Sequence, residues 1–492
     1  MFHRYTVLLL MALAPGPALA LTADQVWADW QRLATSAGTP LTATTRRDGD
    51  RLVLSRLTLA IGISADPSTL RLDRLILRDN PDGTVAVLLP DSFPVTLDAP
   101  GPATPPVTFT TSAPGLAITI AGIGPTAAFD ITAPSLTVTL PPGTGSATVA
   151  VADLTLRHAT DFTAPRNTIA STLAIGTLHA DFATTDGVDG TVTLDLSAFS
   201  AGLDADVLAA VLTRANPVPV DIIRTLSQDV RLTAFLTHGP LSMTVKGSQP
   251  DEPPLDVALT AASGEARIGI DAAGVRYAVS SGATRIDAVL NDPTLPVSTV
   301  GLGYAQAAFG FSSGVGTDAQ PFSAHFRLID LALDDPLWAA ADPATTFPRT
   351  PITIDQAISG TYAIKPEALL PGWQPKSEDD VPFDILALSL DTLLLKGLGA
   401  SLTGTGALTF DPTDLVTFDG VPAPTGTLSF AATGINALID RAADAGLIPP
   451  DDLTGLRLGL AFIAKPGNAP DTLTSKVEFV GKSLLLNGQK LR

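Results

Sequence analysis

Hydrophobic and polar residues alternate along most of this chain with a period of two. Leu57, Leu59 and Ile61 share one face of such a segment, and Arg56 and Thr58 lie on the other. Successive side chains of an extended strand point to opposite faces, so each segment is predicted to be a β-strand with one apolar face. Similar runs recur at residues 85–89, 117–120, 136–140, 154–157, 191–196, 232–236, 266–270, 322–328, 407–410 and 477–486.

The breaks between these runs consist of residues that favour turns, as in Asn80-Pro81-Asp82-Gly83 and Asp186-Gly187. Helical periodicity is rare and does not alternate with the strands, which argues against an α/β fold. We therefore predict a mainly β protein with roughly fifteen or more antiparallel strands, in large curved or elongated sheets, and a few short helices. Two packings remain open: a sandwich of two sheets, or one long curved sheet whose apolar face holds a ligand.

One helix is predicted near the start of the chain. Thr22 and Gln25 have the spacing of a capping box, and an apolar stripe that includes Trp27 and Trp30 ends near Gly38. Two tryptophans on a short helix are compatible with docking on a membrane. We favour a structural role, in which the rings cover the end of a sheet, because each ring buries a large apolar area.

A second helical pattern occurs twice. Gly202 precedes a predicted helix that Pro217 ends, and Gly434 precedes another that Pro449 ends, so both markers are offset by 232 residues. A further helical segment follows each copy, at residues 220–228 and 451–463. This repetition predicts two similar β-rich lobes, each with a helix pair.

The predicted division of the chain follows from that repeat and from a stretch rich in Pro, Gly and Ser. We predict a signal peptide at residues 1–20, a first lobe at 21–246, a linker at 247–254 and a second lobe at 255–492.

The first twenty residues have the order of a secretion signal. Arg4 gives a basic start, residues 7–14 are apolar, and Ala18 and Ala20 form a small-x-small cleavage site before Leu21. The alternative is an uncleaved membrane anchor, but this apolar run is shorter than the roughly 20 residues that cross a bilayer. We therefore predict cleavage after Ala20, export to the periplasm and no transmembrane segment in the mature chain.

Composition narrows the classes of partner. The chain has no cysteine, so no disulfide stabilises it in an oxidising compartment. Its formal net charge is −19, which argues against nucleic acid and bare anionic lipid surfaces as default partners because phosphates require a basic surface. A mean hydropathy of +0.31 is high for a chain without a transmembrane segment. All eight lysines lie from Lys246 onward.

The search for catalytic chemistry finds one weak match. Residues 310–314 read Gly-Phe-Ser-Ser-Gly, the string of a nucleophile elbow. That motif requires a helix directly after the serine, whereas Pro321 and a glycine-rich stretch follow here. We predict a hairpin loop at this position and no catalytic residue.

Metal ligands and cofactor motifs are also not evident. His158, His179, His238 and His325 have no metal-ligand spacing among themselves. His158 with Asp161, and His179 with Asp181, are interpreted as surface pairs. We expect Asp334-Asp335 and Asp451-Asp452 at helix N-termini and Glu378-Asp379-Asp380 in a polar loop. No cofactor is predicted.

Several short segments resemble a family of exported Gram-negative bacterial proteins known as domain of unknown function 2125. They are Ala23-Asp24-Gln25-Val26-Trp27-Ala28-Asp29-Trp30, Leu337-Trp338 with Asp342-Pro343 and Phe347-Pro348-Arg349, Leu370-Pro371-Gly372-Trp373, Phe418-Asp419-Gly420 and Leu484-Leu485-Leu486-Asn487-Gly488-Gln489. The resemblance implies a periplasmic location and brings no catalytic residue. More loosely, the Leu/Thr-rich strands are similar to AsmA-like envelope proteins, which implies a β-groove and a role in lipid handling.

These observations lead to three functional hypotheses. The first is non-catalytic binding of a lipid or other apolar ligand in a β-groove. The second is a structural or interaction module that binds an envelope protein through a sheet edge or between the lobes. The third, which we consider the weakest, is an enzyme acting on an envelope polymer, because no site for it is visible.

Overall fold

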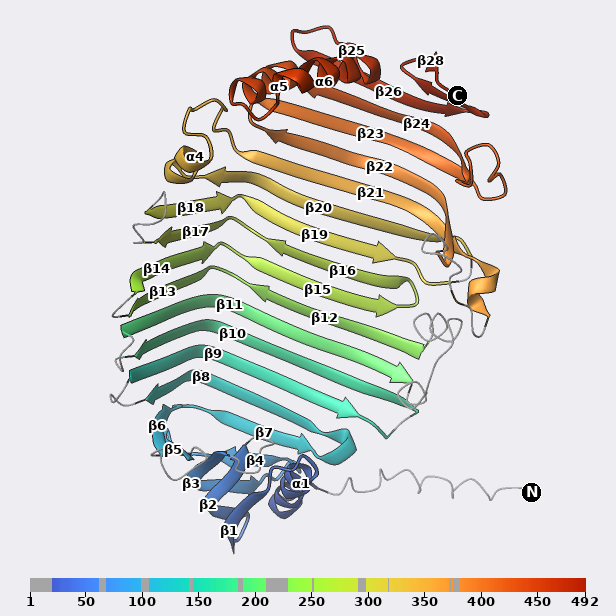
Figure 1. Ribbon diagram of the computed structural model, residues 1–492. Coiled ribbons are helices and arrows are strands. Elements are labelled where there is room, and N and C mark those ends of the chain that lie inside the picture. The colour runs from blue at the N-terminus through green and yellow to red at the C-terminus, as the bar shows by residue number, and fades with distance from the viewer. Residues whose placement is uncertain are drawn as a thin grey trace, which may run out of the picture. The chain divides into compact units, whose positions relative to one another are not determined.

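The computed structural model describes most of the chain, and its strands pair antiparallel throughout (Figure 1). Together with four α-helices among the described residues, this confirms the predicted mainly β fold. The described residues are 20–61, 68–98, 106–140, 145–163, 165–184, 189–208, 229–249, 252–290, 298–316, 318–370, 374 and 381–492.

The chain divides into two compact units. Unit 1 comprises Met1–Pro141 and Thr155–Thr160, and unit 2 comprises Pro142–Leu154 and Asp161–Arg492. This division falls at a different place from the predicted lobes. The described residues of the predicted linker, 247–249 and 252–254, lie in two strands that pair with each other. The two-lobe organisation therefore stays a prediction.

Unit 1 is built from one helix and short strands. Its elements are α1 (Ala23–Ser36), β1 (Leu41–Asp48), β2 (Arg51–Ile61), β3 (Ser68–Asp79), β4 (Val85–Leu88), β5 (Ser92–Asp98), β6 (Val107–Ser112), β7 (Ala117–Gly122) and β8 (Ala128–Leu140), with a 3₁₀ turn at Gly124–Thr126. β9 (Gly145–Asp161) contributes residues to both units.

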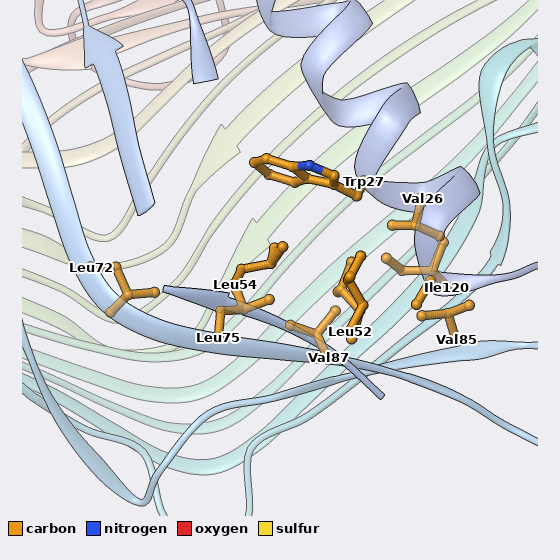
Figure 2. Packing of buried hydrophobic residues seen from close by; sticks show 11 residues of the cluster. Val26, Trp27, Leu52, Leu54, Leu72, Leu75, Val85, Val87 and Ile120 are labelled. Carbon is orange, nitrogen blue, oxygen red and sulfur yellow. The ribbon is translucent and has the colours of Figure 1, made fainter. Parts of the chain in front are cut away.

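The predicted N-terminal helix is confirmed as α1, and both bonds of the Thr22–Gln25 capping box are present. Trp27 is buried in a hydrophobic cluster with Leu54 of β2 and Leu75 of β3 (Figure 2). Trp30 packs against the same cluster. The tryptophans therefore have the structural role that we favoured from the sequence.

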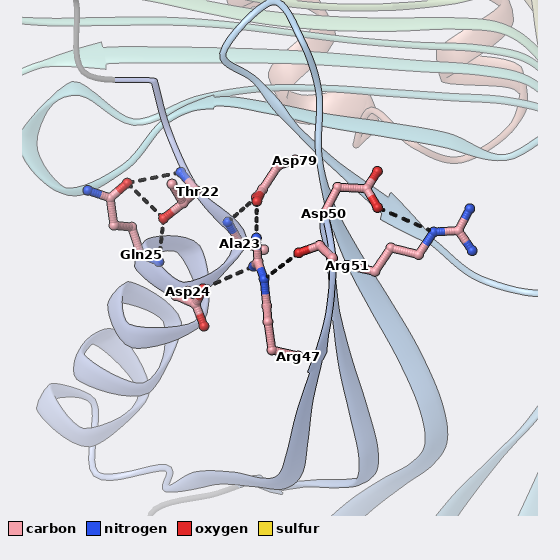
Figure 3. Close-up of polar contacts among 9 residues, drawn as sticks. Thr22, Ala23, Asp24, Gln25, Arg47, Asp50, Arg51 and Asp79 are labelled. Carbon is pink, nitrogen blue, oxygen red and sulfur yellow. Dashed lines mark hydrogen bonds and ion pairs between the residues drawn. The ribbon is translucent and has the colours of Figure 1, made fainter.

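Polar contacts also hold α1 on the strands (Figure 3). Asp79, at the end of β3, accepts a hydrogen bond of 2.6 Å from the backbone N–H of Ala23 and pairs with Arg47. Arg47 pairs in addition with Asp24 at 2.9 Å, in the first turn of the helix. A carboxylate at a helix N-terminus is stabilised by the exposed backbone N–H groups there.

Unit 2 is a sheet with helices at its margins. Its elements are β10 (Arg166–Thr184), β11 (Asp189–Leu208), β12 (Val230–His238), β13 (Leu241–Gln249), β14 (Glu252–Ala261), β15 (Gly264–Asp271), β16 (Gly274–Ser281), β17 (Thr284–Val289), β18 (Thr299–Tyr304), β19 (Gln306–Ser313), β20 (Gln320–Leu333), α4 (Asp335–Ala341), β21 (Ile352–Ile364), a 3₁₀ turn (Pro366–Leu369), β22 (Phe383–Gly397), β23 (Ala400–Asp411), β24 (Ala423–Thr433), α5 (Ile435–Asp444), α6 (Pro450–Ile463), β25 (Lys465–Pro466), β26 (Thr472–Val480), β27 (Ser483–Leu486) and β28 (Gln489–Lys490).

The helix predicted to begin at Gly202 is wrong for the part that the structure describes. Residues 202–208 belong to β11, which pairs with β10 on one side and with β12 on the other. Asp204 and Asp206 alternate with apolar residues and form cross-strand ion pairs with Arg231 and Arg166, which suits a strand. The rest of this helix and the segment at 220–228 lie outside the described residues. In the second copy, α5 and α6 are confirmed.

A line of interruptions crosses the sheet of unit 2. The strand pairs β12/β13, β14/β15, β16/β17 and β18/β19 each form one interrupted strand, and their breaks lie opposite one another at residues 239–240, 262–263, 282–283 and 305. Ala198 of β11 and Asp330 of β20 have positive φ at the same level. The strands change direction along this line, which we call the crease (Figure 1).

Candidate functional site

One face of the sheet in unit 2 is apolar across many strands. Residues directly opposite each other in paired strands lie on the same face, so the register identifies rows of neighbouring side chains. The first row, from β12 to β22, is Ala234, Ile268, Tyr277, Phe311, Ala324, Ile358 and Leu390. The second row is Leu236, Ala266, Val279, Phe309, Phe326, Gln356 and Leu393. We call the face that carries these two rows the apolar face.

The opposite face of the same strands is polar. One of its rows, from β12 to β22, is Thr233, Gly269, Arg276, Ser312, Ser323, Ser359 and Ser389. Arg276 pairs with Asp271, and Arg267 pairs with Glu265. The hydrogen bonds from these arginines lower the pKa values of both carboxyl groups, so the charges persist at neutral pH. Only one face of the sheet is therefore suited to an apolar ligand.

The apolar face is not covered by any other part of the described chain. Tyr277, Phe309, Phe311 and Phe326 remain 40%, 43%, 41% and 43% exposed although strands flank them on both sides. The one cluster of buried hydrophobic residues among the described residues lies in unit 1. Of the two packings left open above, the sandwich is therefore not found for these strands of unit 2. Contiguous exposed apolar surface of this kind marks a binding site in many proteins.

Aromatic rings lie close together at two places on this face, within the two rows and at the ends of β20, β21 and β22. The rings of Tyr277 and Phe309 lie 6.2 Å apart between centroids, and that of Tyr362 lies 6.3 Å from Phe322 and 5.8 Å from Phe383. The hydroxyl of Tyr362 donates a hydrogen bond of 2.9 Å to the backbone carbonyl of Gly314. Because the protein itself satisfies this hydroxyl, the polar end of Tyr362 needs no partner in a ligand.

A groove of about 650 Å³ follows the crease. It includes His179, whose two ring nitrogens lie 2.6 Å from Asp195 and 2.5 Å from Asp181. The hydrogen bond with Asp195, followed by that with Asp181, raises the pKa of His179 above its ordinary value. The predicted pair with Asp181 is confirmed as a contact. Asp195 was missed because it comes from the neighbouring strand, and only the register shows that it faces His179.

A second hollow, of about 600 Å³, lies at the margin of the sheet away from the crease. Gly190 and Gly247 are paired there, and Gly247 is paired in turn with Leu255. Because these two paired glycines have no side chains, the surface is hollowed here, beside the exposed side chain of Leu255.

The structure supports the rejection of a nucleophile elbow at residues 310–314. It also corrects the conformation that we predicted for these residues. Residues 310–313 lie in β19 and do not form the predicted loop, because they pair with β16 and β20. Ser312 shares a hydrogen bond of 2.8 Å with Ser323 across the strands. The described residues between Ser313 and Gln320 form no helix.

The other singled-out residues have structural contacts. His158 lies with its ring centroid 4.9 Å from that of Phe129, and His238 lies 2.7 Å from the carbonyl of Gly239. As predicted, Asp334 caps α4, and Asp451 and Asp452 lie in the first turn of α6. Within the described residues no group of His, Asp or Glu side chains is arranged to hold a metal ion.

Some residues singled out in the sequence lie at or beyond the limits of the described chain. Ala18 and the acidic stretch 378–380 lie outside the described residues. Ala20 and Leu21 are the first described residues, and the backbone N–H of Leu21 donates to the carbonyl of Gly83 at 3.0 Å. Cleavage between them stays a prediction. Among the described helices, none has the length and hydropathy required to cross a membrane.

Comparison with known proteins gives a family match for part of the chain. No curated protein and no solved structure matches the chain. Residues 252–488, which contain the strands from β14 to β27 and most of the apolar face, match one family model. This region, slightly less than half of the chain, matches the family described as an uncharacterized protein conserved in bacteria (DUF2125).

Proposed function

We propose that this protein is exported to the periplasm and binds a lipid, or another elongated apolar ligand, on the apolar face of unit 2 without catalysing a reaction on it. The single observation that carries the proposal is the pair of apolar rows, whose four central aromatic side chains are about two-fifths exposed. Exposed apolar surface has a free-energy cost in water that an apolar ligand would relieve.

The dimensions of the apolar face suit a chain-like ligand. Its rows cross seven strands, and neighbouring strands are about 4.8 Å apart, so each row is about 29 Å long. The hydrocarbon core of a bilayer is about 30 Å thick and holds two acyl chains end to end. One row can therefore accommodate a fully extended acyl chain along its whole length.

The charge distribution also supports an apolar occupant. Arg267, Arg276 and Arg327 belong to the polar face of these strands, and each has a carboxylate partner there. A lipid on the apolar face would bury hydrocarbon without removing a charged group from water, so it would avoid that desolvation cost.

The proposal is tested by purifying the protein from the periplasm, extracting it with organic solvent and identifying bound lipids by mass spectrometry. A fluorescent fatty-acid probe then measures affinity. The double variant Phe309→Ser with Phe326→Ser is expected to weaken probe binding by tenfold or more, because both rings lie side by side on the apolar face.

Phe235→Ser is the matched control, since this phenylalanine belongs to the polar face of the same strands. It should leave probe affinity unchanged. Recovery of protein without lipid, together with no probe binding, would contradict the proposal. Probe binding that is equally weakened by Phe235→Ser would place the ligand elsewhere.

A further inference from the structure

A second apolar surface lies on the other side of the crease from the two apolar rows, and we call it the far arm. Figure 1 shows β13, β14, β17 and β18 on that side of the crease. The first row of the far arm, from β10 to β20, is Ala180, Leu194, Met243, Leu259, Ile286, Leu302 and Leu333. Its second row, from β10 to β18, is Phe182, Val192, Val245, Val257, Ala288 and Val300. Every side chain in these two rows is apolar.

The opposite face of the far arm is polar. One of its rows, from β11 to β17, is Thr193, Thr244, Ala258 and Asp287. On the same polar face Asp287 pairs with Arg285, and Lys246 pairs with Asp256 at 3.3 Å. The sheet therefore has one apolar and one polar face on both sides of the crease.

The order of apolar residues along the strands changes at the crease. In β11 the apolar residues of the far arm have even numbers up to Leu196, and those beyond the crease have odd numbers from Phe199 onward. Ala198, between them, has a φ of +50°, and a residue in this left-handed region interrupts the regular alternation of a strand. β20 changes in the same way at Asp330, whose φ is +54°. The shift in numbering is what a strand needs to keep its apolar residues on one side of a bent sheet.

Side chains that meet across the crease support this arrangement directly. Ser281 lies two residues beyond Val279 of the second apolar row, and Thr284 and Tyr304 are paired with each other two residues from the first row of the far arm. The hydroxyl oxygens of Ser281 and Thr284 lie 2.9 Å apart, and the hydroxyl of Tyr304 donates to Ser281 at 3.3 Å. The apolar face and the far arm thus form one surface, with a group of hydroxyls between them.

The far arm is open and as long as the apolar face. Phe182 is 45% exposed, and Leu255, beside the second row, is 43% exposed. The first row of the far arm crosses seven strands, so it is about 29 Å long, which is the length of each row of the apolar face. One extended acyl chain occupies one such row, so the surface has room for a second chain.

We propose that the ligand has two hydrocarbon chains joined by an uncharged polar linkage, with one chain on the apolar face, the other on the far arm, and the linkage at the crease. This inference rests on the proposed function and specifies the class of its ligand. A single hydrocarbon chain that crossed the crease would separate the hydroxyls of Ser281 and Tyr304 from water, whereas ester groups placed there would lie beside them as polar neighbours. The linkage is uncharged because neither these hydroxyls nor the rows of the two arms carry a charge.

Competition between lipids tests the two-chain ligand. The fluorescent fatty-acid probe bound to the full chain is displaced by diacyl or monoacyl phosphatidylcholine with the same short acyl chain, each below its micellar concentration. We expect the diacyl lipid to compete about tenfold more strongly or better, because its second chain buries additional apolar surface. The double variant Leu259→Ser with Ile286→Ser, which are paired on the far arm, should remove most of this advantage and leave the affinity for the monoacyl lipid unchanged.

Two further variants make the result specific to the far arm. Phe182→Ser alters an exposed side chain whose loss does not threaten folding, and it should lower the advantage of the diacyl lipid in the same direction. Ala258→Ser, beside Leu259 but on the polar face of β14, is the matched control and should have no effect.

The outcomes separate this inference from the proposed function. If Phe309→Ser with Phe326→Ser weakens the binding of both lipids while the far-arm variants leave their ratio unchanged, the inference is overturned and the proposed function stands. The inference is also overturned if the far-arm variants weaken the monoacyl lipid as strongly as the diacyl lipid, because one chain would then cross the crease. A complete lack of probe binding would remove the proposed function and this inference with it.

Discussion

The ring of Phe235 in β12 covers the backbone of Gly202 in β11, which is paired with it across the two strands. A Cβ atom added at Gly202 would lie only 2.7 Å from Cζ of this ring. The guanidinium group of Arg267 lies over the same ring, with its carbon 5.9 Å from the ring centroid of Phe235. Glycine at this position therefore serves the packing of a cross-strand neighbour.

This contact predicts that Gly202→Val destabilises the protein by about 1–3 kcal/mol, because the added side chain would have to displace the ring of Phe235. The measurement is the free energy of unfolding in urea. Gly247→Ala is the control, since a Cβ added there meets nothing within 4 Å. An equal loss of stability in the two variants would show that the ring contact is not the cause.

The incorrect prediction of a helix at Gly202 shows which information the sequence does not contain. Glycine before a helix and proline after it are frequent, but glycine also occurs opposite an aromatic ring in a sheet. The sequence identifies the glycine and not its neighbour, because Phe235 is 33 residues away. At Gly434 the same local pattern does precede a helix, since the backbone there has a φ of +71° and no strand continues.

Unit 1 depends on the burial of Trp27. Its side chain is 7% exposed and packs with Leu54 and Leu77, which are fully buried. Trp27→Ala should lower the free energy of unfolding of unit 1 by about 3–5 kcal/mol, because the cavity cannot collapse completely. Near-ultraviolet circular dichroism during urea unfolding checks this. Leu33→Ala, on the exposed side of the same helix, should change stability by less than about 0.5 kcal/mol.

His179 gives stability a pH dependence of defined sign. Its hydrogen bonds with Asp195 and Asp181 raise its pKa above the ordinary value of 6.5, so the folded state favours the protonated ring. The stabilisation of the folded state by protonated His179 is therefore fully present below about pH 6.5. It is lost as the pH rises through the raised pKa of this residue. Thermal melts between about pH 5.5 and pH 8.5 should show a smaller decrease in stability on the alkaline side for His179→Gln than for the parent.

His325→Gln is the matched control, because it makes the same substitution on the polar face without the two carboxylate partners. An unchanged pH profile in His179→Gln would mean that the histidine is not the titrating group. The change of slope is the diagnostic feature, since a uniform loss of stability at every pH would report only lost packing.

The sequence predicted the composition of the apolar face better than its extent. Period-two alternation at 232–236, 266–270 and 322–328 correctly identified strands with one apolar face. Whether such faces are closed against another sheet depends on contacts far apart in the sequence, and alternation does not encode these contacts. From the sequence, a sandwich of two sheets and a single sheet with an open apolar face therefore both remained possible. The strand register then showed that Tyr277 is paired with Phe311 and Phe309 with Phe326 on one face.

The start of α5 depends on a residue that is distant in sequence. Gly434, at the N-cap, has no side chain to cap the helix. Asp471 takes this role, because its carboxylate accepts hydrogen bonds from the backbone N–H groups of Asn436 and Ala437, both at 3.0 Å. Partial burial raises the pKa of Asp471, but these hydrogen bonds outweigh it and the pKa is lowered overall.

Asp471→Ala should therefore destabilise the protein by about 1–2 kcal/mol, the usual cost of losing an N-cap. Asp471→Asn retains an acceptor oxygen and should lose less than half of that amount. Because the folded-state pKa is depressed, the advantage of the parent over Asp471→Asn is present above about pH 4 and disappears as the pH falls through the lowered value. Urea unfolding at neutral pH and near pH 3 measures this difference. An advantage that persists undiminished at the lower pH would show that the charge of Asp471 contributes nothing to the start of α5.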